Sequence, residues 1–186
     1  MTAPIFDLLQ AQLIPASRDP EPEGAAPEGA ASEGHEPSVR SLGVQHGVLV
    51  LAIRPDALTS LATRLRDDFA FDLFLDVTAV DWPGEALRFE VVHHFYSTSH
   101  KVRVRLKCRV PEADPTVDSL TPLYGSAGYM ERECHDMYGI VFRGNADLRP
   151  ILLYEGFVGH PLRKDYPKQK EQPLVPYLPP QGALVR

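Results

Sequence analysis

The chain has 186 residues, enough for one domain with a substantial core but not for two of ordinary size. Its longest apolar run, Val48 to Ile53, is far shorter than the roughly 20 residues of a membrane span. The first ten residues lack the basic and apolar regions of a secretory signal, and the only two cysteines, Cys108 and Cys134, lack CxxC spacing. We therefore expect a cytoplasmic protein without disulfides and without a metal cluster of its own.

The net charge of -6 is concentrated near the N-terminus. Residues 1–40 contain seven acidic residues against two arginines, so the rest of the chain has a net charge of about -1. The C-terminal third is only mildly basic, which does not indicate nucleic-acid binding.

The two ends of the chain differ in composition from its middle. Residues 1–14 predict a short amphipathic helix bounded by Pro4 and Pro15. Residues 15–40 are rich in Pro, Gly, Ala and Glu and nearly devoid of large apolar side chains, which favours a disordered acidic linker, a solvated tether more than an acidic binding tail. Residues 168–186 contain four prolines and predict an extended tail that runs over a surface.

Residues 41–167 carry the patterns of a folded domain. The expected elements, in chain order, are a strand at 47–53, a helix at 55–69, a strand at 71–80 with residues 71, 73, 75, 77 and 79 on one face, a hairpin of strands 87–97 and 101–110, a helical turn near 117–123 and a glycine-rich hinge at 125–128. This order predicts an α+β domain, a small and mainly antiparallel sheet with helices on one face.

The second strand of the hairpin, KVRVRLKCRV, has the cleanest alternation in the chain. One face carries aliphatic side chains and Cys108, which we therefore expect in the core. The other face carries a row of five cations: Lys101, Arg103, Arg105, Lys107 and Arg109. Like charges in one row repel each other unless water or an acidic partner screens them, so this row is either a solvated face or a docking surface.

The stretch ERECHDMYG, residues 131–139, concentrates charged and reactive side chains. Its pattern predicts a helix that ends at Gly139, with Arg132 and Asp136 four residues apart and within ion-pair reach. The apolar side of this helix consists of Met130, Cys134, Met137 and Tyr138.

Chemical interpretations of this stretch are weak. Successive helical side chains point about 100° apart, so Cys134, His135 and Asp136 do not converge on a metal or form a catalytic dyad. Glu131 and Glu133 do not face each other either. A stand-alone cysteine hydrolase remains as an alternative in which Cys134 meets a distant histidine: His93, His94, His100 or His160.

No cofactor loop is visible in the sequence. Neither GxGxxG after a strand nor GxxxxGK[ST] occurs, so a dinucleotide fold and a P-loop are not indicated. His93 and His94 lie on opposite faces of a strand, so at most one is buried, and each is expected to be a hydrogen-bonded polar side chain and not a ligand. The residues alone favour a binding or scaffold subunit over an enzyme.

At ERECHDMYGIVFRGNADLRPILL, and again at GHPLRKDYP, the sequence resembles the C subunit of the proton-pumping NADH:quinone oxidoreductase, respiratory complex I. The resemblance covers about residues 43–167 and is specific in the last third. Asn145, Ala146, Pro150 and Tyr129 depart from the usual family pattern, which affects the expected loop shape around residues 143–150. The residues that match the motifs, and that the resemblance implies as subunit-interface residues, are Glu131, Arg132, Glu133, Asp136, Tyr138, Gly139, Asp147, Arg149, Gly159, His160, Pro161, Leu162, Arg163, Lys164 and Asp165.

The resemblance implies a peripheral-arm subunit with no catalytic, cofactor-binding or metal-binding residue of its own. FMN and the Fe-S clusters would lie in partner subunits, and this chain would dock on the quinone-site D subunit, near the B and I subunits. Arg132, Arg149, Arg163 and Lys164 would either pair with acidic groups across an interface or lock the loop to the helix. The complex would sit at the cytoplasmic face of the inner (plasma) membrane. The alternative is the equivalent subunit of a related membrane-bound hydrogenase or other quinone-linked dehydrogenase, and the choice of ubiquinone or menaquinone lies in other subunits.

Overall fold

The computed structural model describes residues 3–14 and 38–169. Residues 15–37 of the expected linker and residues 170–186 of the expected tail lie outside the described residues. None of the described helices combines the length and the apolarity needed to cross a bilayer.

A five-stranded sheet forms the centre of the fold, in the order β1-β2-β5-β4-β3. Three of its four strand pairs are antiparallel, and β2 pairs with β5 in parallel, so the predicted mainly antiparallel sheet is confirmed. The predicted hairpin is also confirmed, with Phe89 opposite Val110 and Ser97 opposite Val102. The strands are β1 (Val39–Gln45), β2 (Val48–Ile53), β3 (Leu73–Asp81), β4 (Phe89–Ser97) and β5 (Val102–Val110).

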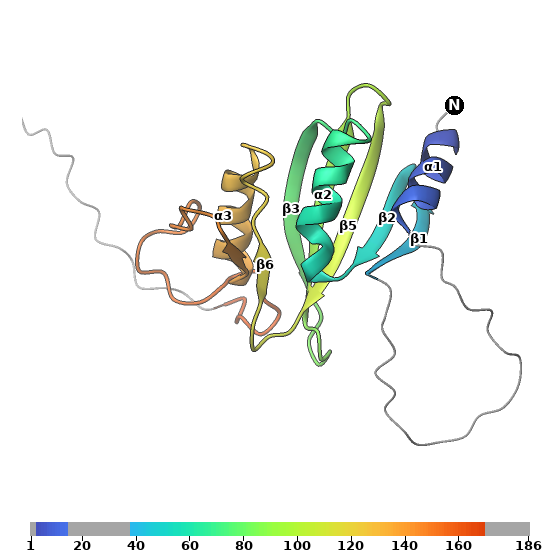
Figure 1. Cartoon of the computed structure of the whole chain (residues 1–186). Coiled ribbons are helices and arrows are strands. Elements are labelled where there is room, and N and C mark those ends of the chain that lie inside the picture. The colour runs from blue at the N-terminus through green and yellow to red at the C-terminus, as the bar shows by residue number, and fades with distance from the viewer. Residues whose placement is uncertain (1–2, 15–37, 170–186) are drawn as a thin grey trace, which may run out of the picture.

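Two helices pack on one face of this sheet. A 3-10 turn at Pro55–Ala57 leads into α2 (Leu58–Asp67), which lies over the sheet (Figure 1). Its buried residues are those that the helical pattern predicts: Leu58, Leu61, Ala62 and Leu65. The N-terminal helix α1 (Ala3–Leu13) buries Phe6, Leu9 and Leu13 in the same core, and Arg64 of α2 donates to the carbonyl oxygen of Gln12 at 3.0 Å.

The remaining elements pack against the same core at the β3 side of the sheet, where the Tyr124 ring lies 5.7 Å from those of Phe74 and Phe95. Helix α3 (Ala127–Tyr138) contacts β3 and runs beside it (Figure 1). A parallel pair of short strands, β6 (Thr116–Asp118) and β7 (Val141–Arg143), brackets α3 in sequence. The architecture is therefore α+β, as the sequence predicts, and Cys108 is buried in its core.

Several local expectations are wrong. Strand β1 begins at Val39, within the last two residues of the expected linker. Residues 116–118 form a strand, so the helical turn expected near 117–123 is shorter, at 120–124, where the N–H groups of Leu123 and Tyr124 donate to the carbonyl oxygen of Leu120 at 2.9 Å. Ala127 and Gly128 belong to the first turn of α3, so the expected hinge is helical there. Strands β1 and β6 take their conformation from pairing with β2 and β7, which local propensity does not report.

The face predicted for β3 is also wrong in its first half. An irregularity between Phe74 and Asp76 shifts the register with β4. Phe74 is buried as a result, whereas Leu73 and Leu75, expected on the same face as Val77 and Ala79, are exposed. A β-bulge adds one residue to a strand and reverses the alternation beyond it, so Val77 and Ala79 face the core as predicted.

Candidate functional site

Helix α3 ends at Gly139, as the sequence predicts. Gly139 has a positive φ of 75°, and its N–H donates to the carbonyl oxygen of His135 at 2.7 Å. This left-handed C-cap turns the chain sharply, which lets the residues that follow fold back along the helix. Cys134 is buried as expected, but the carboxylates of Glu131 and Asp136 are buried too.

The segment that folds back, residues 147–165, has no helix or strand. We call it the C-terminal loop. Asp136 of α3 holds its middle, since one carboxylate oxygen, Oδ2, accepts the N–H groups of Ile151, Leu152 and Leu153 at 2.7, 2.9 and 3.3 Å. Burial alone would raise the pKa of Asp136, but these three donors outweigh it and the pKa is lowered. Asp136 is therefore an anion that organises the loop backbone.

Arg132 holds the beginning of the same loop. Its guanidinium donates to the carbonyl oxygens of Arg149 and Pro150, both at 2.9 Å, and lies 3.9 Å from the Asp147 carboxylate. The predicted ion pair between Arg132 and Asp136 is therefore replaced by contacts from each residue to the loop. Arg149 itself pairs with Asp147 at 2.9 Å and is largely exposed.

The end of the loop is fixed by His160 and Arg163. His160 donates through Nδ1 to the carbonyl oxygen of Asp136 at 2.9 Å, and Arg163 donates through Nε to that of Tyr138 at 2.6 Å. Both side chains lie against Gly139, where an added Cβ would come within 2.5 Å of each of them. Only glycine fits this position, both for its backbone conformation and for this close approach.

The Glu131 side chain bonds to the residues that precede α3 in sequence and to those that follow it. Its carboxylate accepts hydrogen bonds from the Ser119 hydroxyl at 2.8 Å, the Leu120 N–H at 2.7 Å and the Asn145 amide at 2.9 Å. Burial raises the pKa of Glu131 more than these donors lower it. Asn145, one of the departures from the family pattern, thus contributes a contact that joins the residues after β7 to α3.

A second anchor lies at the β3–β4 end of the sheet and was not anticipated. Asp81 and Arg88 form a buried bidentate pair at 2.7 and 2.9 Å, and the N–H of Lys164 donates to the same Asp81 carboxylate at 2.7 Å. Arg88 also pairs with Asp165 at 3.0 Å and with Glu112 at 2.6 Å. The hydrogen bonds from Arg88 are the main reason why the pKa of Asp81 is lowered.

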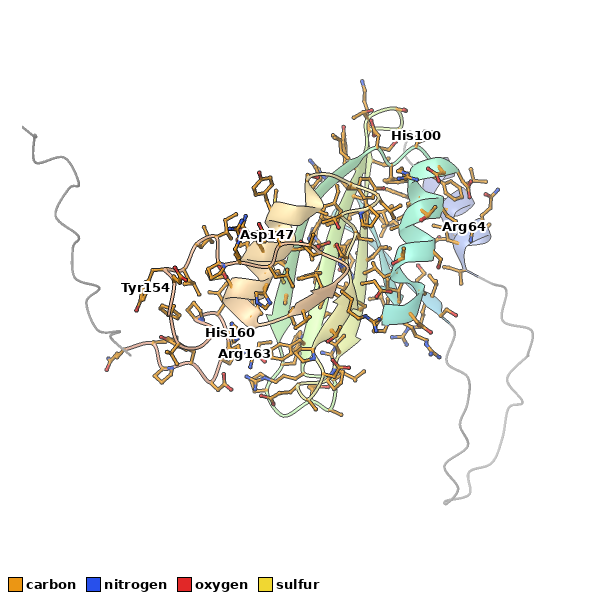
Figure 2. The ribbon with its side chains drawn as sticks, turned by 60° about the vertical axis from the view of Figure 1, so that its left-hand side comes forward. Arg64, His100, Asp147, Tyr154, His160 and Arg163 are labelled. Carbon is orange, nitrogen blue, oxygen red and sulfur yellow. The ribbon has the colours of Figure 1, made fainter. Side chains whose placement is uncertain are left out.

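The outer side of the C-terminal loop is apolar. Leu152 is 61% exposed, Val158 64% and Leu162 49%. Figure 2 shows Tyr154 on the outer side of the loop, away from the sheet, while His160 and Arg163 lie closer to it. A surface pocket of about 450 Å³ opens beside the loop and is lined by Arg132, Arg149, Pro150, Leu153 and Glu155.

Comparison with known proteins identifies the family. Residues 51–172 match the family described as respiratory-chain NADH dehydrogenase, 30 Kd subunit. The chain belongs to this family. The resemblance seen in the motifs is thereby confirmed.

Relatives of this 30 Kd subunit family include the C subunit of the NADH-quinone oxidoreductase of Methylorubrum populi, 44% identical over 70% of this chain and 60% of the relative. That of Agrobacterium fabrum is 47% identical over 69% of this chain and 65% of the relative. The C 2 subunit of the Rhizobium meliloti enzyme is 42% identical over 77% of this chain and 81% of the relative. This chain therefore spans less than two thirds of the first two relatives.

Two solved structures share the fold. A trypsin-resistant fragment of Nqo5 superposes with a TM-score of 0.55 at 27% identity, over 59% of this chain and 89% of the fragment. A chain from the membrane-bound sulfane sulfur reductase, an archaeal respiratory membrane complex, gives a TM-score of 0.63 at 26% identity, over 72% of this chain and 80% of its own length. Members of the family are thus subunits of respiratory membrane complexes.

The remaining motif residues of this family member are placed as follows. Leu162 donates its N–H to the carbonyl oxygen of Met137 at 3.1 Å, and Pro161 beside it is half-buried. Gly159 has a positive φ of 102° and packs against Tyr166, 2.9 Å from where a Cβ would stand. Glu133 and the side chain of Lys164 are exposed.

The geometry gives no support to cysteine chemistry at Cys134. The thiol is buried, and burial, with Asp76 as the next cause, raises its pKa, so it stays protonated at neutral pH. The neighbouring His135 uses Nδ1 to donate to the carbonyl oxygen of Ile140 at 2.8 Å. Across residues 3–14 and 38–169, no three His, Cys, Asp or Glu side chains are grouped as metal ligands would be.

The Asp81–Arg88 pair is the anchor of the C-terminal loop that sequence reasoning missed. The sequence DWPG predicts the turn after β3, but it does not show that Asp81 points inward. The sequence does contain a signal for the pair, because Arg88 follows Asp81 by seven residues across a tight turn, which allows the two side chains to meet. Neither residue belongs to the motifs that carry the family resemblance.

Proposed function

We propose that this chain is a non-redox structural subunit of the peripheral arm of NADH:quinone oxidoreductase, and that it docks on the quinone-site D subunit through the C-terminal loop. One observation supports this most directly. The loop has no regular secondary structure, yet its backbone is hydrogen-bonded to α3 and to the last residue of β3, while Leu152, Val158 and Leu162 are exposed.

Such an arrangement suits a docking element. Exposed apolar side chains on a folded surface are typical of sites that another protein covers. The loop is already ordered by Asp136, Arg132 and Asp81, so binding costs less conformational entropy than it would for a free segment. In this interpretation Arg132 and Arg163 lock the loop to the helix, and the exposed Arg149 is available to a partner.

The chemistry of the assembled complex belongs to other subunits in this proposal. FMN and Fe-S clusters in partner subunits pass electrons from NADH to quinone, and the complex couples this transfer to proton translocation. The chain lies on the cytoplasmic face of the inner (plasma) membrane, beside the B and I subunits, and has no activity when isolated. Flavin or cluster absorbance in the purified chain, or NADH:quinone turnover by it, would contradict this part.

The docking proposal is tested by affinity capture from membranes with a tagged chain. Leu152→Glu combined with Val158→Glu is expected to reduce recovery of the D subunit at least tenfold, because the charges would enter an apolar interface. Val44→Glu is the matched control, since Val44 is similarly exposed but lies on β1 at the opposite edge of the sheet. Undiminished recovery of the D subunit with the loop variant would refute the docking site.

The charged residues of α3 give a second test of the same proposal. Arg132→Ala and Asp136→Ala release the loop without changing its outer side chains. Assembly of the peripheral arm should fall more than any chemical step. Intact arms with slowed quinone reduction would count against a purely structural role.

The second candidate is the equivalent subunit of a related complex, a membrane-bound hydrogenase or another quinone-linked dehydrogenase. The similarity to a chain of the sulfane sulfur reductase is the observation that supports this second candidate. Mass spectrometry of the captured partners separates the two candidates. A captured D-type subunit with intact nickel-ligating cysteines would favour the hydrogenase.

A further inference from the structure

The basic row of β5 lies at the centre of the sheet, because β5 is the middle strand in the order of five. Strand β5 begins at Val102, so Lys101 lies in the preceding turn and four cations remain in the row: Arg103, Arg105, Lys107 and Arg109. Their alternate residues, such as Val104 and Leu106, face the core with α1 and α2. The four cations therefore lie on the opposite face, which we call the basic face.

Two of the four cations have acidic partners within the chain. Lys107 pairs with Glu90 of β4 at 3.1 Å. Arg109 pairs with Glu85 at 3.1 Å, and its guanidinium lies 5.5 Å from the centre of the Trp82 ring. These contacts neutralise one end of the row.

The other two cations lack such partners. Arg103 lies over the ring of Tyr96, 5.5 Å from its centre, and has no carboxylate within ion-pair distance among the described residues. Arg105 likewise has no ion pair there, and its Nε is buried without a hydrogen-bond partner. Across the strands Arg105 faces His94, which supplies no negative charge. A guanidinium N–H that is buried and unbonded costs free energy unless a further group binds it.

The floor between these cations is apolar. Val50 of β2 and Val92 of β4 lie on the same face as Arg105, by the strand register, and are nearly inaccessible to solvent. The aliphatic stems of arginine and lysine cover such a floor and carry their charged ends outward. The basic face thus has one partly desolvated guanidinium group, that of Arg105, at its centre.

We infer that the basic face binds an acidic protein segment of a neighbouring subunit, whose carboxylates pair with Arg103 and Arg105. Guanidinium groups bind carboxylates in a planar bidentate geometry, which would satisfy the unbonded Arg105 Nε. A nucleic acid fits less well, since the chain has a net charge of -6 and the row offers only two unpaired cations. This surface is separate from the C-terminal loop, which lies beyond α3 (Figure 1).

Zero-length cross-linking identifies the occupant. Arg103→Lys keeps the positive charge and introduces a primary amine, which a carbodiimide couples to an adjoining carboxylate. In the assembled complex, we expect a cross-linked peptide between residue 103 and an acidic segment of another subunit. A cross-link to the chain's own acidic residues between Asp19 and Glu36 would overturn the proposal, because the face would then be used within the chain.

Charge removal supplies the second measurement. Arg103→Gln with Arg105→Gln should weaken retention of the chain in the complex about tenfold at roughly 0.1 M salt, with a much smaller difference at about 1 M salt. Arg54→Gln is the control, since Arg54 is a half-exposed arginine that already pairs with Asp56. Unchanged retention together with no intersubunit cross-link would overturn the proposal and leave a solvated face. If the Leu152→Glu and Val158→Glu variant still recovers the D subunit, only the docking proposal for the C-terminal loop is refuted. The proposal for the basic face is tested independently by the Arg103 and Arg105 variants.

Discussion

Replacement of His93 by leucine is expected to stabilise the protein. His93 lies on the inner face of β4, opposite Val77 and Leu106, with its ring 6.2 Å from that of Phe74. Its side chain is 1% exposed, and neither ring nitrogen has a hydrogen-bond partner. The prediction that at most one of the two adjacent histidines is buried is confirmed, but the buried one is not hydrogen-bonded as expected.

The magnitude has two parts. A buried polar group without a partner costs about 1–3 kcal/mol, and leucine removes that cost with a similar volume, so we expect a gain of about 1–2 kcal/mol near pH 8. The second part depends on pH, because burial lowers the pKa of His93 from 6.5 to about 3. Below about pH 6.5 the unfolded chain binds a proton that the folded chain excludes. The free energy of unfolding therefore decreases by about 1.4 kcal/mol for each unit by which the pH is lowered.

At about pH 5 this second part amounts to roughly 2 kcal/mol, since pH 5 lies about 1.5 units below the unfolded-state pKa. The advantage of His93→Leu should therefore grow from about 1–2 kcal/mol near pH 8 to about 3–4 kcal/mol near pH 5. Urea unfolding followed by circular dichroism at both pH values measures it. His93→Gln is the control, because it lacks the titration but keeps an unbonded polar group. An advantage that is equal at the two pH values would refute the reasoning.

Three further substitutions test the anchors of the C-terminal loop. Arg88→Met should cost about 3–5 kcal/mol in urea unfolding because it leaves the buried Asp81 carboxylate unpaired, and adding Asp81→Asn should recover part of this; an equal or larger loss in the double variant would contradict it. Asp136→Asn keeps an acceptor but loses the charge, and should speed amide hydrogen exchange at residues 151–153 at neutral pH. The pKa of Asp136 is lowered in the folded chain, so the stabilisation by its charge is fully present at neutral pH and is lost in acid. Unchanged exchange in the variant at neutral pH would contradict this prediction. Gly139→Ala should lower stability by at least about 2 kcal/mol in thermal unfolding, from the left-handed backbone and the contact with Arg163, and a loss below about 0.5 kcal/mol would be incompatible with so close a contact.

The elements that sequence reasoning predicted well are those with strong periodicity of their own. Helix α2 and the β4–β5 hairpin carry strong periodicity, and the hairpin closes through a short turn. Strand β1 has the sequence VRSLGVQ, with little alternation, and is stabilised by pairing with β2. The parallel pairs β2–β5 and β6–β7 join residues far apart in sequence, so no local pattern reports them.

The candidate site was predicted in its location but not in its contacts, for a physical reason. The helix, its end at Gly139 and the burial of Cys134 follow from helical spacing. The partners of Arg132 and Asp136, however, are backbone carbonyl and N–H groups of the C-terminal loop. Every residue carries the same backbone groups, so a sequence contains no sign of which of them a side chain will bind.

This use of backbone partners also determines how the charged motif would contribute to the docking that we propose. Arg132, Asp136 and Arg163 already have their hydrogen bonds inside the chain, so pairing them with another subunit would require breaking contacts of 2.6–2.9 Å. Their charge fixes the shape of the loop, and that shape determines which side chains face outward. Leu152 and Leu162 are exposed on the outer side of the loop, and the exposed Arg149 lies at its rim. In the docking mode that we propose, the charged residues would therefore act on the interface indirectly, by fixing the loop that presents the apolar contacts.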